Sequence, residues 1–357
     1  SVEIDADSEG GEGAFYTWRH TEIEAVLGQQ DAGWFLRFHP LAAPSNWEGD
    51  PILTAAEAAP DPEERARLAG LRRKLLEARA HRPPPGRDDK VVTEWNGLMI
   101  TALATAARRF ARPDWLAMAR NAFHAILKTE KDGRLLHSSL AGRGRVPAFS
   151  VDYAAMINAA LALFAAEPDG AYLDHGRRWL ATLDRFHADA AGTGYYLSPG
   201  DAEDVPLRVR GDADEATPSA TAQLVEALSR LALATGDEGR ERHAEAVRQQ
   251  AARRGAAQTH GRAGIVNAGA VAEAAMKLVI SGRRDGDLAA AADRLVDPRR
   301  LDIIAAPAEI ARTDDLPKPA SADQAAAWLC TGQLCRAPIT DAKELEEALK
   351  GYTNSVL

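Results

Sequence analysis

A loop followed by an apolar helix recurs along this chain at nearly constant spacing, and this repeat constrains the fold more than any other feature. An acidic residue stands shortly before or at the start of each helix, at Asp89, Asp152 and Asp214. The first two are 63 residues apart and the last two are 62 apart, which suits one helical hairpin with its connections. Regular repeats of this kind form stacked supersecondary units. We therefore predict a closed array of hairpins whose acidic helix starts face one common pocket.

The predicted helices alternate between two compositions. Inner helices rich in Ala and Leu are expected at 94–110, 152–166 and 219–235, and more charged outer partners at 113–129, 172–186 and 238–253. An inner helix is buried on most sides, whereas an outer helix keeps one face in water. Short Gly-rich, alternating stretches at 133–149 and 192–210 predict β-hairpins between the helical pairs.

The two ends of the chain depart from this pattern. Near the start, helices are expected at 21–28 and 61–82, separated by an irregular stretch at 32–60 that contains several Pro and Gly. Near the end, helices are expected at 267–277 and 285–295 and strands at 278–282, 301–305 and 326–330.

These elements predict a mainly α fold, a six-hairpin (α/α) toroid-like array with short β-hairpins and a small C-terminal α/β elaboration. The predicted division is a toroid body at 1–276 and a tail at 277–357 packed on it. Because Ser1 begins what resembles the interior of a fold, we expect that an N-terminal domain precedes this chain.

Charge and cysteine usage exclude several classes of protein. The net charge is -9, and the basic stretch from Arg65 to Arg82 is interrupted by Leu and Ala at helical spacing, so no nucleic-acid partner is expected. The longest apolar run, 154–166, is far below the roughly 20 residues that span a bilayer, so no membrane association is expected. With two cysteines in 357 residues, we expect a reducing, cytoplasmic location and no disulfide framework.

A set of motifs, in order from end to end of the chain, resembles one known family. They are Asp5-Ala6-Asp7-Ser8-Glu9-Gly10 with Glu12-Gly13-Ala14-Phe15-Tyr16, Asn46-Trp47-Glu48-Gly49, Asp88-Asp89-Lys90 with Trp95-Asn96-Gly97-Leu98-Met99-Ile100, Asp152-Tyr153-Ala154, Ala216-Thr217-Pro218-Ser219, and Cys330 with Cys335-Arg336-Ala337-Pro338. The chain resembles the YyaL-type family, also called spermatogenesis-associated thioredoxin-domain proteins. The resemblance implies a toroid similar to those of sugar epimerases and several glycoside hydrolases, preceded by a thioredoxin-like domain that this chain lacks. One departure is Ala220-Thr221, where the family usually carries Gly-Asn.

The carboxylates at the helix starts are the first candidates for chemistry. Glycoside hydrolysis requires one protonated and one ionised carboxyl on either side of the bond, roughly 5–10 Å apart. We predict Asp89 and Asp152 as the acid–base pair, with Asp88 and Asp214 as further catalytic candidates. Asp is also a favoured helix cap, so a purely structural role for each is the alternative.

Residues near these acids are the predicted ligand contacts. Trp95 and Tyr153 are expected to shape a sugar site beside Asn96, although ordinary core packing is the alternative for both aromatic rings. Tyr196 and Arg210 lie on the second predicted hairpin, where an Arg could bind a ligand carboxylate or phosphate. His137 precedes Asp152 and is the nearest candidate for a base.

The leading hypothesis is a carbohydrate-active enzyme-like domain with a small sugar-like ligand and glycoside hydrolysis as its candidate reaction. The alternatives are a non-catalytic scaffold for a thioredoxin-like partner domain and a sugar epimerase or isomerase. No cofactor and no metal are predicted, and Asp5 with Asp7 is more typical of a polar turn than of a cation site. Cys330 and Cys335 are expected to be packed or loosely paired thiols, with a redox role as the minority hypothesis.

Overall fold

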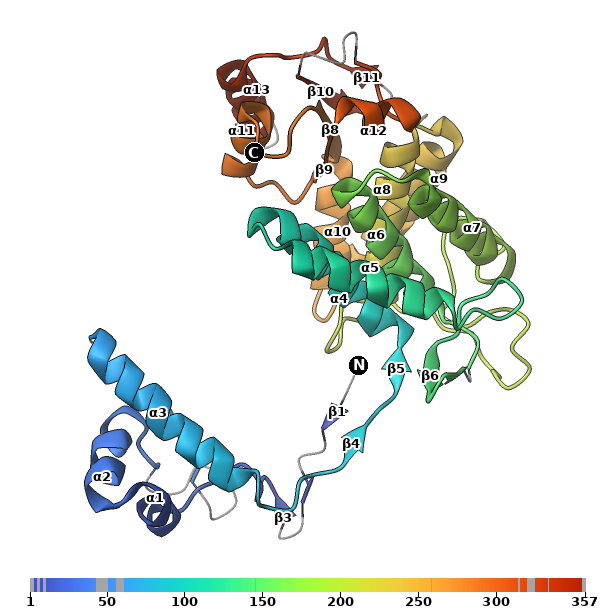
Figure 1. The fold of residues 1–357 in the computed structure, drawn as a ribbon. Helices are drawn as coiled ribbons and strands as arrows, with labels where there is room; N and C mark the ends of the chain where they lie inside the picture. The colour runs from blue at the N-terminus through green and yellow to red at the C-terminus, as the bar shows by residue number, and fades with distance from the viewer. Residues whose placement is uncertain are drawn as a thin grey trace. The chain divides into compact units, whose positions relative to one another are not determined.

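The chain is composed of two compact units, residues 2–90 and residues 91–357, which are taken separately below. A computed structural model describes residues 3–4, 7–8, 11–42, 51–55, 61–144, 146–257, 259–313, 315–319, 325–332 and 334–354 (Figure 1). Asp5 and the Asn46–Gly49 motif lie outside these residues. The sequence did not predict a division near residue 90.

Three helices form the N-terminal unit: α1 (His20–Leu27), α2 (Gln29–Phe38) and α3 (Pro62–Arg79). Short strands pair as β1 (Glu3–Ile4) with β4 (Arg87–Asp88) and as β2 (Asp7–Ser8) with β3 (Gly11–Glu12). Asp61 caps α3 by accepting the amide of Glu64 at 2.7 Å, with Pro62 in the first turn as expected.

Helix α2 falls in a stretch that was predicted to be irregular, and that prediction is wrong. Gly28, with φ of 82°, ends α1 and lets the chain begin α2 at once. Ala32, Phe35 and Phe38 stand at helical spacing and are buried in a core with Trp18 and the leucines of α3. That spacing was the sequence signal for the helix.

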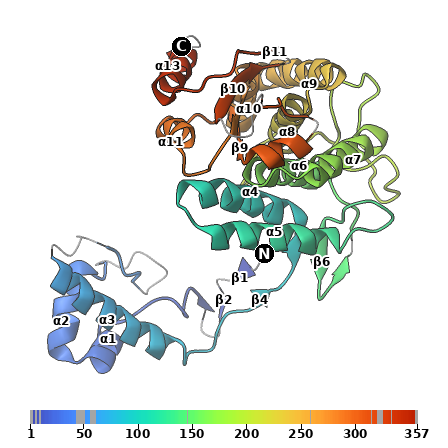
Figure 2. The same ribbon diagram turned by 45° about the horizontal axis from the view of Figure 1, so that its top comes forward.

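The larger unit is an array of helical hairpins. Its helices, in chain order, are α4 (Thr93–Arg109), α5 (Pro113–Leu127), α6 (Ser150–Ala166), α7 (Gly170–Phe186), α8 (Ala220–Thr235), α9 (Glu238–Ala257) and α10 (Ala263–Glu273). Helices α4, α6, α8 and α10 pack against one another in succession as the inner layer, and α5, α7 and α9 pack on their own inner partners (Figure 2). Helix α6 is buried along nearly its whole length, as its lack of charge predicted.

Helices α4 and α6 approach each other most closely at Gly97. A Cβ atom at this position would lie 2.8 Å from the carbonyl carbon and the Cβ of Ala155. Real Cβ atoms do not come this close to backbone, so glycine is required for this separation of the two helices.

One of the two predicted hairpins forms and the other does not. The first is a three-stranded sheet of β5 (Val91–Val92), β6 (Ser138–Leu140) and β7 (Arg143–Gly144). Among residues 192–210 there is no strand, and one isolated bridge joins Ala188 to Tyr195. The Arg208 guanidinium donates to the carbonyls of Phe186, His187 and Ser198. Single backbone hydrogen bonds, such as that from the Leu197 amide to the Val209 carbonyl, also hold this segment, without a ladder.

A four-stranded sheet follows the helical array. Its strands are β8 (Met276–Ser281), β9 (Arg300–Ala305), β10 (Ala326–Thr331) and β11 (Leu334–Cys335), in the order β11-β10-β8-β9. The β8–β9 pair is parallel and the other pairs are antiparallel. Alternate residues of these strands point to opposite faces of the sheet and contribute to two cores. Val279 and Trp328 belong to the core of the helical array. Leu278 and Leu329 belong to a second core, shared with α11 (Asp287–Arg294) and α13 (Ala342–Asn354). A short helix, α12 (Pro307–Arg312), follows β9.

The mainly helical class with a small C-terminal α/β elaboration is confirmed. The larger unit contributes three hairpins and the inner helix α10. Closure of six hairpins into a ring stays a prediction. Within the described part of the chain, no helix combines the length and the apolar character that a bilayer span requires.

Candidate functional site

The first turns of three inner helices meet in a polar cluster. It consists of Glu94 on α4, Asp152 on α6, Gln223 on α8 and His137, which directly precedes β6, and we call it the helix-start cluster. The position of His137 is fixed by the backbone, because its amide donates to Val146 and its carbonyl accepts from Thr93. The hairpin order of the chain therefore brings together residues from 94 to 223.

Asp152 is the most buried member of the helix-start cluster, with 0% of its surface exposed. Its carboxylate accepts the backbone amides of Phe149 at 2.8 Å and Glu94 at 2.9 Å, and it lies 3.0 Å from Nδ1 of His137. Burial raises the pKa of Asp152, although hydrogen bonding and the charge of His137 oppose the rise. Asp152 thus joins the starts of α4 and α6 and orients His137.

Glu94 is, with Gln223, a member of the helix-start cluster that the sequence argument missed. It is 8% exposed and accepts from the Gln223 amide at 3.0 Å. Burial raises its pKa, the Gln223 and Thr217 donors oppose this, and the nearby Asp152 charge adds to it. The sequence did carry a signal for Glu94, because Glu94 occupies the first turn of α4 as Asp152 occupies the first turn of α6. The near-constant spacing directed attention to Asp89 instead.

His137 is the member of the helix-start cluster that meets solvent, with 28% of its side chain exposed. A carboxylate at Nδ1 fixes the ring orientation and favours a proton on that nitrogen, which leaves Nε2 as the acceptor. The Phe149 ring lies 4.7 Å away, centroid to centroid. This Asp–His arrangement suits a group that takes up and returns protons.

Asp214 repeats the linking role of Asp152 one hairpin further along. Its carboxylate accepts the backbone amides of Ser219 at 2.9 Å and Gly264 at 2.6 Å, which joins the starts of α8 and α10. Burial alone would raise the pKa of Asp214, but the amides of Gly264 and Ser219 outweigh it and lower the pKa. This geometry favours a structural role for Asp214.

Asp88 and Asp89 belong to the N-terminal unit. The Asp88 carboxylate is 2.9 Å from Nζ of Lys90, whose hydrogen bond lowers the pKa of Asp88. The Asp89 carboxylate is 2.7 Å from the Arg87 guanidinium. Since Asp89 and Asp152 lie in different units, their pairing stays a prediction.

The predicted aromatic contacts lie in different surroundings. Trp95 is 41% exposed at the start of α4, beside Asn96, whose side-chain amide donates to the Val92 carbonyl at 2.8 Å. Tyr153 is 0% exposed and its ring packs edge-on against His187. Exposure leaves the Trp95 ring available to a ligand, whereas burial of Tyr153 favours the core-packing alternative.

The predicted ligand contacts in the 192–210 segment, Tyr196 and Arg210, interact with other side chains of the larger unit. The Arg208 and Arg210 guanidiniums lie 4.3 Å and 4.8 Å from the centroid of the half-buried Tyr196 ring. Arg210 also pairs with Asp189 at 2.8 Å. This pairing favours a structural role for Arg210 over binding of a ligand anion.

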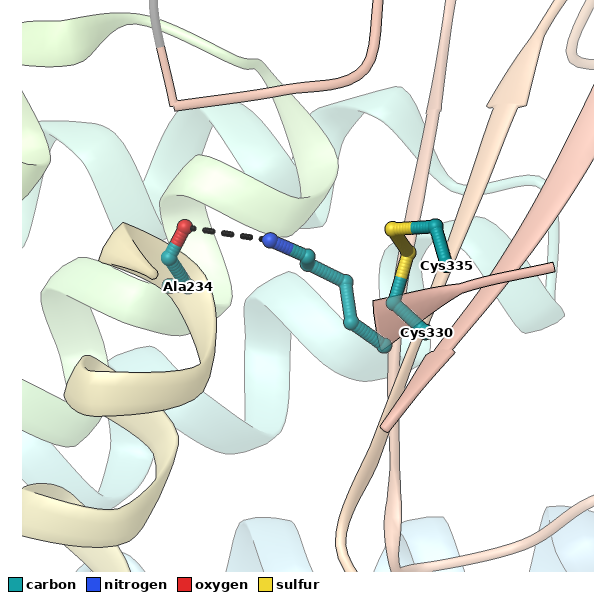
Figure 3. The surroundings of a disulfide bond; sticks show 4 residues. Ala234, Cys330 and Cys335 are labelled. Atoms are coloured by element: carbon teal, nitrogen blue, oxygen red, sulfur yellow. Dashed lines mark hydrogen bonds between the residues drawn. A yellow bond between two sulfur atoms is a disulfide. The ribbon is translucent and has the colours of Figure 1, made fainter. Parts of the chain in front are cut away.

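The two cysteines form a disulfide (Figure 3), which corrects the expectation of packed or loosely paired thiols. The antiparallel register of β10 and β11 places Cys330 directly opposite Cys335, and this pairing depends on a strand that the sequence argument did not predict.

Among the described residues, no group of three His, Cys, Asp or Glu side chains is placed to hold a metal ion.

The fold and the helix-start cluster define a class of protein: an α/α hairpin array with a carboxylate–histidine cluster at the starts of its inner helices. No protein-family model matches the chain. Among curated proteins, spermatogenesis-associated protein 20 of Homo sapiens is 30% identical over 265 residues, which is 63% of this chain and 34% of that protein. An uncharacterised protein of Caenorhabditis elegans is 30% identical over 256 residues, 62% of this chain and 35% of that protein. The chain is therefore similar to spermatogenesis-associated protein 20, in agreement with the resemblance of its motifs, and it spans about a third of the length of these relatives.

Two solved structures show a weaker likeness. A cellobiose 2-epimerase from Bacillus thermoamylovorans is 12% identical with a TM-score of 0.38, over 45% of this chain and 44% of that chain. An alpha-mannanase from Bacteroides thetaiotaomicron is 16% identical with a TM-score of 0.38, over 64% of this chain and 57% of that chain. Likeness at this level carries no argument about activity.

Proposed function

We propose that the larger unit is a carbohydrate-active enzyme domain that transfers a proton on a sugar-like ligand, with His137 as the acid–base group. The observation that carries the proposal is the Asp152–His137 contact of 3.0 Å, in which a fully buried carboxylate orients a partly exposed imidazole. Proton transfer by a positioned imidazole is the chemistry of isomerisation and epimerisation at a carbon beside a carbonyl. The geometry thus favours the epimerase or isomerase alternative over hydrolysis.

Hydrolysis is less well supported because it needs two carboxyls with free oxygens at the bond. Asp152 has no exposed surface, and its oxygens are occupied by two backbone amides and His137. Glu94 has a different use in proton transfer. Burial favours its protonated form, and a neutral carboxyl can donate a hydrogen bond to the oxygen on which negative charge develops.

Buried polar atoms near the helix-start cluster have unused hydrogen-bonding capacity. The buried atoms Oγ of Ser150, Oδ1 of Asn158 and Oε1 of Gln223 have no hydrogen-bond partner within the described residues. Buried polar atoms are normally paired, so such atoms indicate water or a ligand. The exposed ring of Trp95 offers an apolar face of the kind on which sugars stack.

The test is hydrogen exchange on candidate substrates. The protein is incubated with reducing sugars and sugar acids in deuterated water, and NMR measures deuterium at the carbon beside the carbonyl. We expect exchange on at least one sugar, reduced by about 100-fold or more in His137→Gln. His124→Gln, on an exposed face of the outer helix α5, is the matched control and should exchange as the wild type does. Wild-type protein that exchanges none of the panel would overturn the proposal, and release of a chromophore from nitrophenyl glycosides would return hydrolysis to the lead.

A scaffold function is the second candidate, and a specific observation favours it. Asp152 and Asp214 each accept amides from two helix starts, which is a structural arrangement. If both acids only link helices, Asp152→Ala and Asp214→Ala will each destabilise the unit by about 1–3 kcal/mol, whereas His137→Gln will change neither stability nor any exchange reaction.

A further inference from the structure

The Cys330–Cys335 disulfide joins a buried residue to an exposed one at the edge of the sheet. Cys330 is 1% exposed on β10, and Cys335 is exposed on β11, the two-residue edge strand. Gly332, with φ of 53°, takes the left-handed conformation at the tip of this hairpin. A thiolate must reach a sulfur atom in order to exchange with a disulfide, so attack is open from the Cys335 side.

A buried lysine is the cross-strand neighbour of the buried cysteine. Lys277 on β8 is the antiparallel partner of Cys330, and opposite residues share one face with Cβ atoms roughly 4.5–5.5 Å apart. Lys277 is 5% exposed, and its Nζ donates to the Ala234 carbonyl at a long 3.4 Å, as the dashed line in Figure 3 marks. Burial lowers the pKa of Lys277, which eases release of a proton.

Strand β10 is held in the sheet by hydrogen-bonded neighbours other than the disulfide-linked β11. Strand β10 pairs with β8 from Ala326 to Cys330, and Ala327 pairs on its other side with Ile339. A bond across a loop this short also removes less chain entropy than one across a long loop. The Cys330–Cys335 disulfide is therefore a candidate for a chemical role.

We propose that Cys330–Cys335 is a thiol–disulfide exchange site for a dithiol partner, in which Lys277 stabilises and protonates the departing sulfur. A partner thiolate attacks Sγ of Cys335, the bond to Sγ of Cys330 breaks, and the electron pair leaves on Cys330, which takes a proton from the lysine ammonium. The second thiol of the partner loses its proton to solvent and attacks the partner sulfur of the mixed disulfide. Cys335 leaves as a thiolate and takes a proton from solvent, and the lysine amine regains its proton from solvent. The disulfide of this protein is reduced to two thiols, and the partner dithiol is oxidised to a disulfide.

A cavity lies beside the hairpin that carries the disulfide. The hairpin residues Thr331, Gly332 and Leu334 line a cavity of about 900 Å³ together with residues of α8, α9 and α10. Exchange would therefore take place beside this cavity.

The experiment measures how fast the folded protein is reduced. Oxidised protein is mixed with dithiothreitol under native conditions, and samples taken over time are quenched with iodoacetamide. Mass spectrometry then measures the fraction of protein whose two cysteines have been alkylated. We expect reduction to outpace global unfolding, and Lys277→Met to slow it on the order of tenfold because the departing sulfur loses its cation. Lys277→Arg should restore part of the rate. Lys318→Met is the matched control, since Nζ of Lys318 also donates to carbonyls at the end of a helix.

Single cysteine variants give a second measurement that does not depend on Lys277. In Cys330→Ser the exposed Cys335 should react rapidly with dithiobis(nitrobenzoate), and in Cys335→Ser the buried Cys330 should react slowly. Reduction no faster than unfolding, an unchanged rate in Lys277→Met, or equal reactivity of the two cysteine variants would each overturn the proposal.

Discussion

At the scale of single residues, burial decides what the ionisable groups of the larger unit can do. The two acids Asp152 and Asp214 make similar contacts to backbone amides, yet burial raises the pKa of the first, and hydrogen bonds lower that of the second. The same residue type in the same linking role in two hairpins therefore has opposite tendencies to hold a proton. Motif spacing carries no information about this difference.

His187 gives a prediction at this scale. It is 0% exposed, and burial is the main reason that its pKa falls to about 4. The unfolded chain binds a proton near pH 6.5, where the folded chain does not, so stability falls as pH drops from about 6.5 to 4, by up to about 3 kcal/mol.

Urea denaturation at pH 7 and pH 4.5 measures this loss. His187→Gln, which stays neutral, should lose less stability over that interval than the wild type, and His124→Gln should lose the same amount as the wild type. Parallel losses in wild type and His187→Gln would contradict the assignment.

At the scale of helices, the inner layer depends on a close approach at one glycine. In Gly97→Ala the added Cβ meets the backbone of Ala155 at 2.8 Å, so α4 and α6 must separate. We expect a loss of about 1–3 kcal/mol in the free energy of unfolding, larger than the gain in helix propensity. Gly269→Ala in α10, where a Cβ meets nothing within 4 Å, should instead stabilise by up to about 1 kcal/mol. Denaturation curves for both variants check the prediction, and equal shifts would refute it.

Helices of the array were predictable because each is a long apolar or amphipathic run with clear ends. The predicted 113–129 and 219–235 segments correspond to α5 (Pro113–Leu127) and α8 (Ala220–Thr235). Elements held by particular side chains were not predictable, such as the 192–210 segment that Arg208 fixes. The helix-start cluster was predicted in part: Asp152 and His137 were named, while Glu94 and Gln223 depend on how helices far apart in sequence pack.

At the scale of the whole molecule, the described residues form three separate cores. One contains Trp18, Phe35 and Leu75 of the N-terminal unit, and the others draw on residues 100–349. We expect residues 91–357, expressed alone, to fold cooperatively with the helix-start cluster intact, because each of its members is in this unit.

Calorimetry of the full chain and of residues 91–357 tests this expectation. The full chain should show the melting transition of the fragment, shifted by no more than a few degrees, together with a smaller transition from residues 2–90. A fragment without a cooperative transition would show that the larger unit requires the smaller one.

The cystine at the edge of the sheet has a practical consequence for anyone who purifies this protein. Host cells that keep thiols reduced and those that oxidise them will supply two chemical species, which differ by the hydrogen atoms of Cys330 and Cys335. Assays on an undefined mixture would average over both species. Each preparation therefore needs its oxidation state recorded beside its concentration.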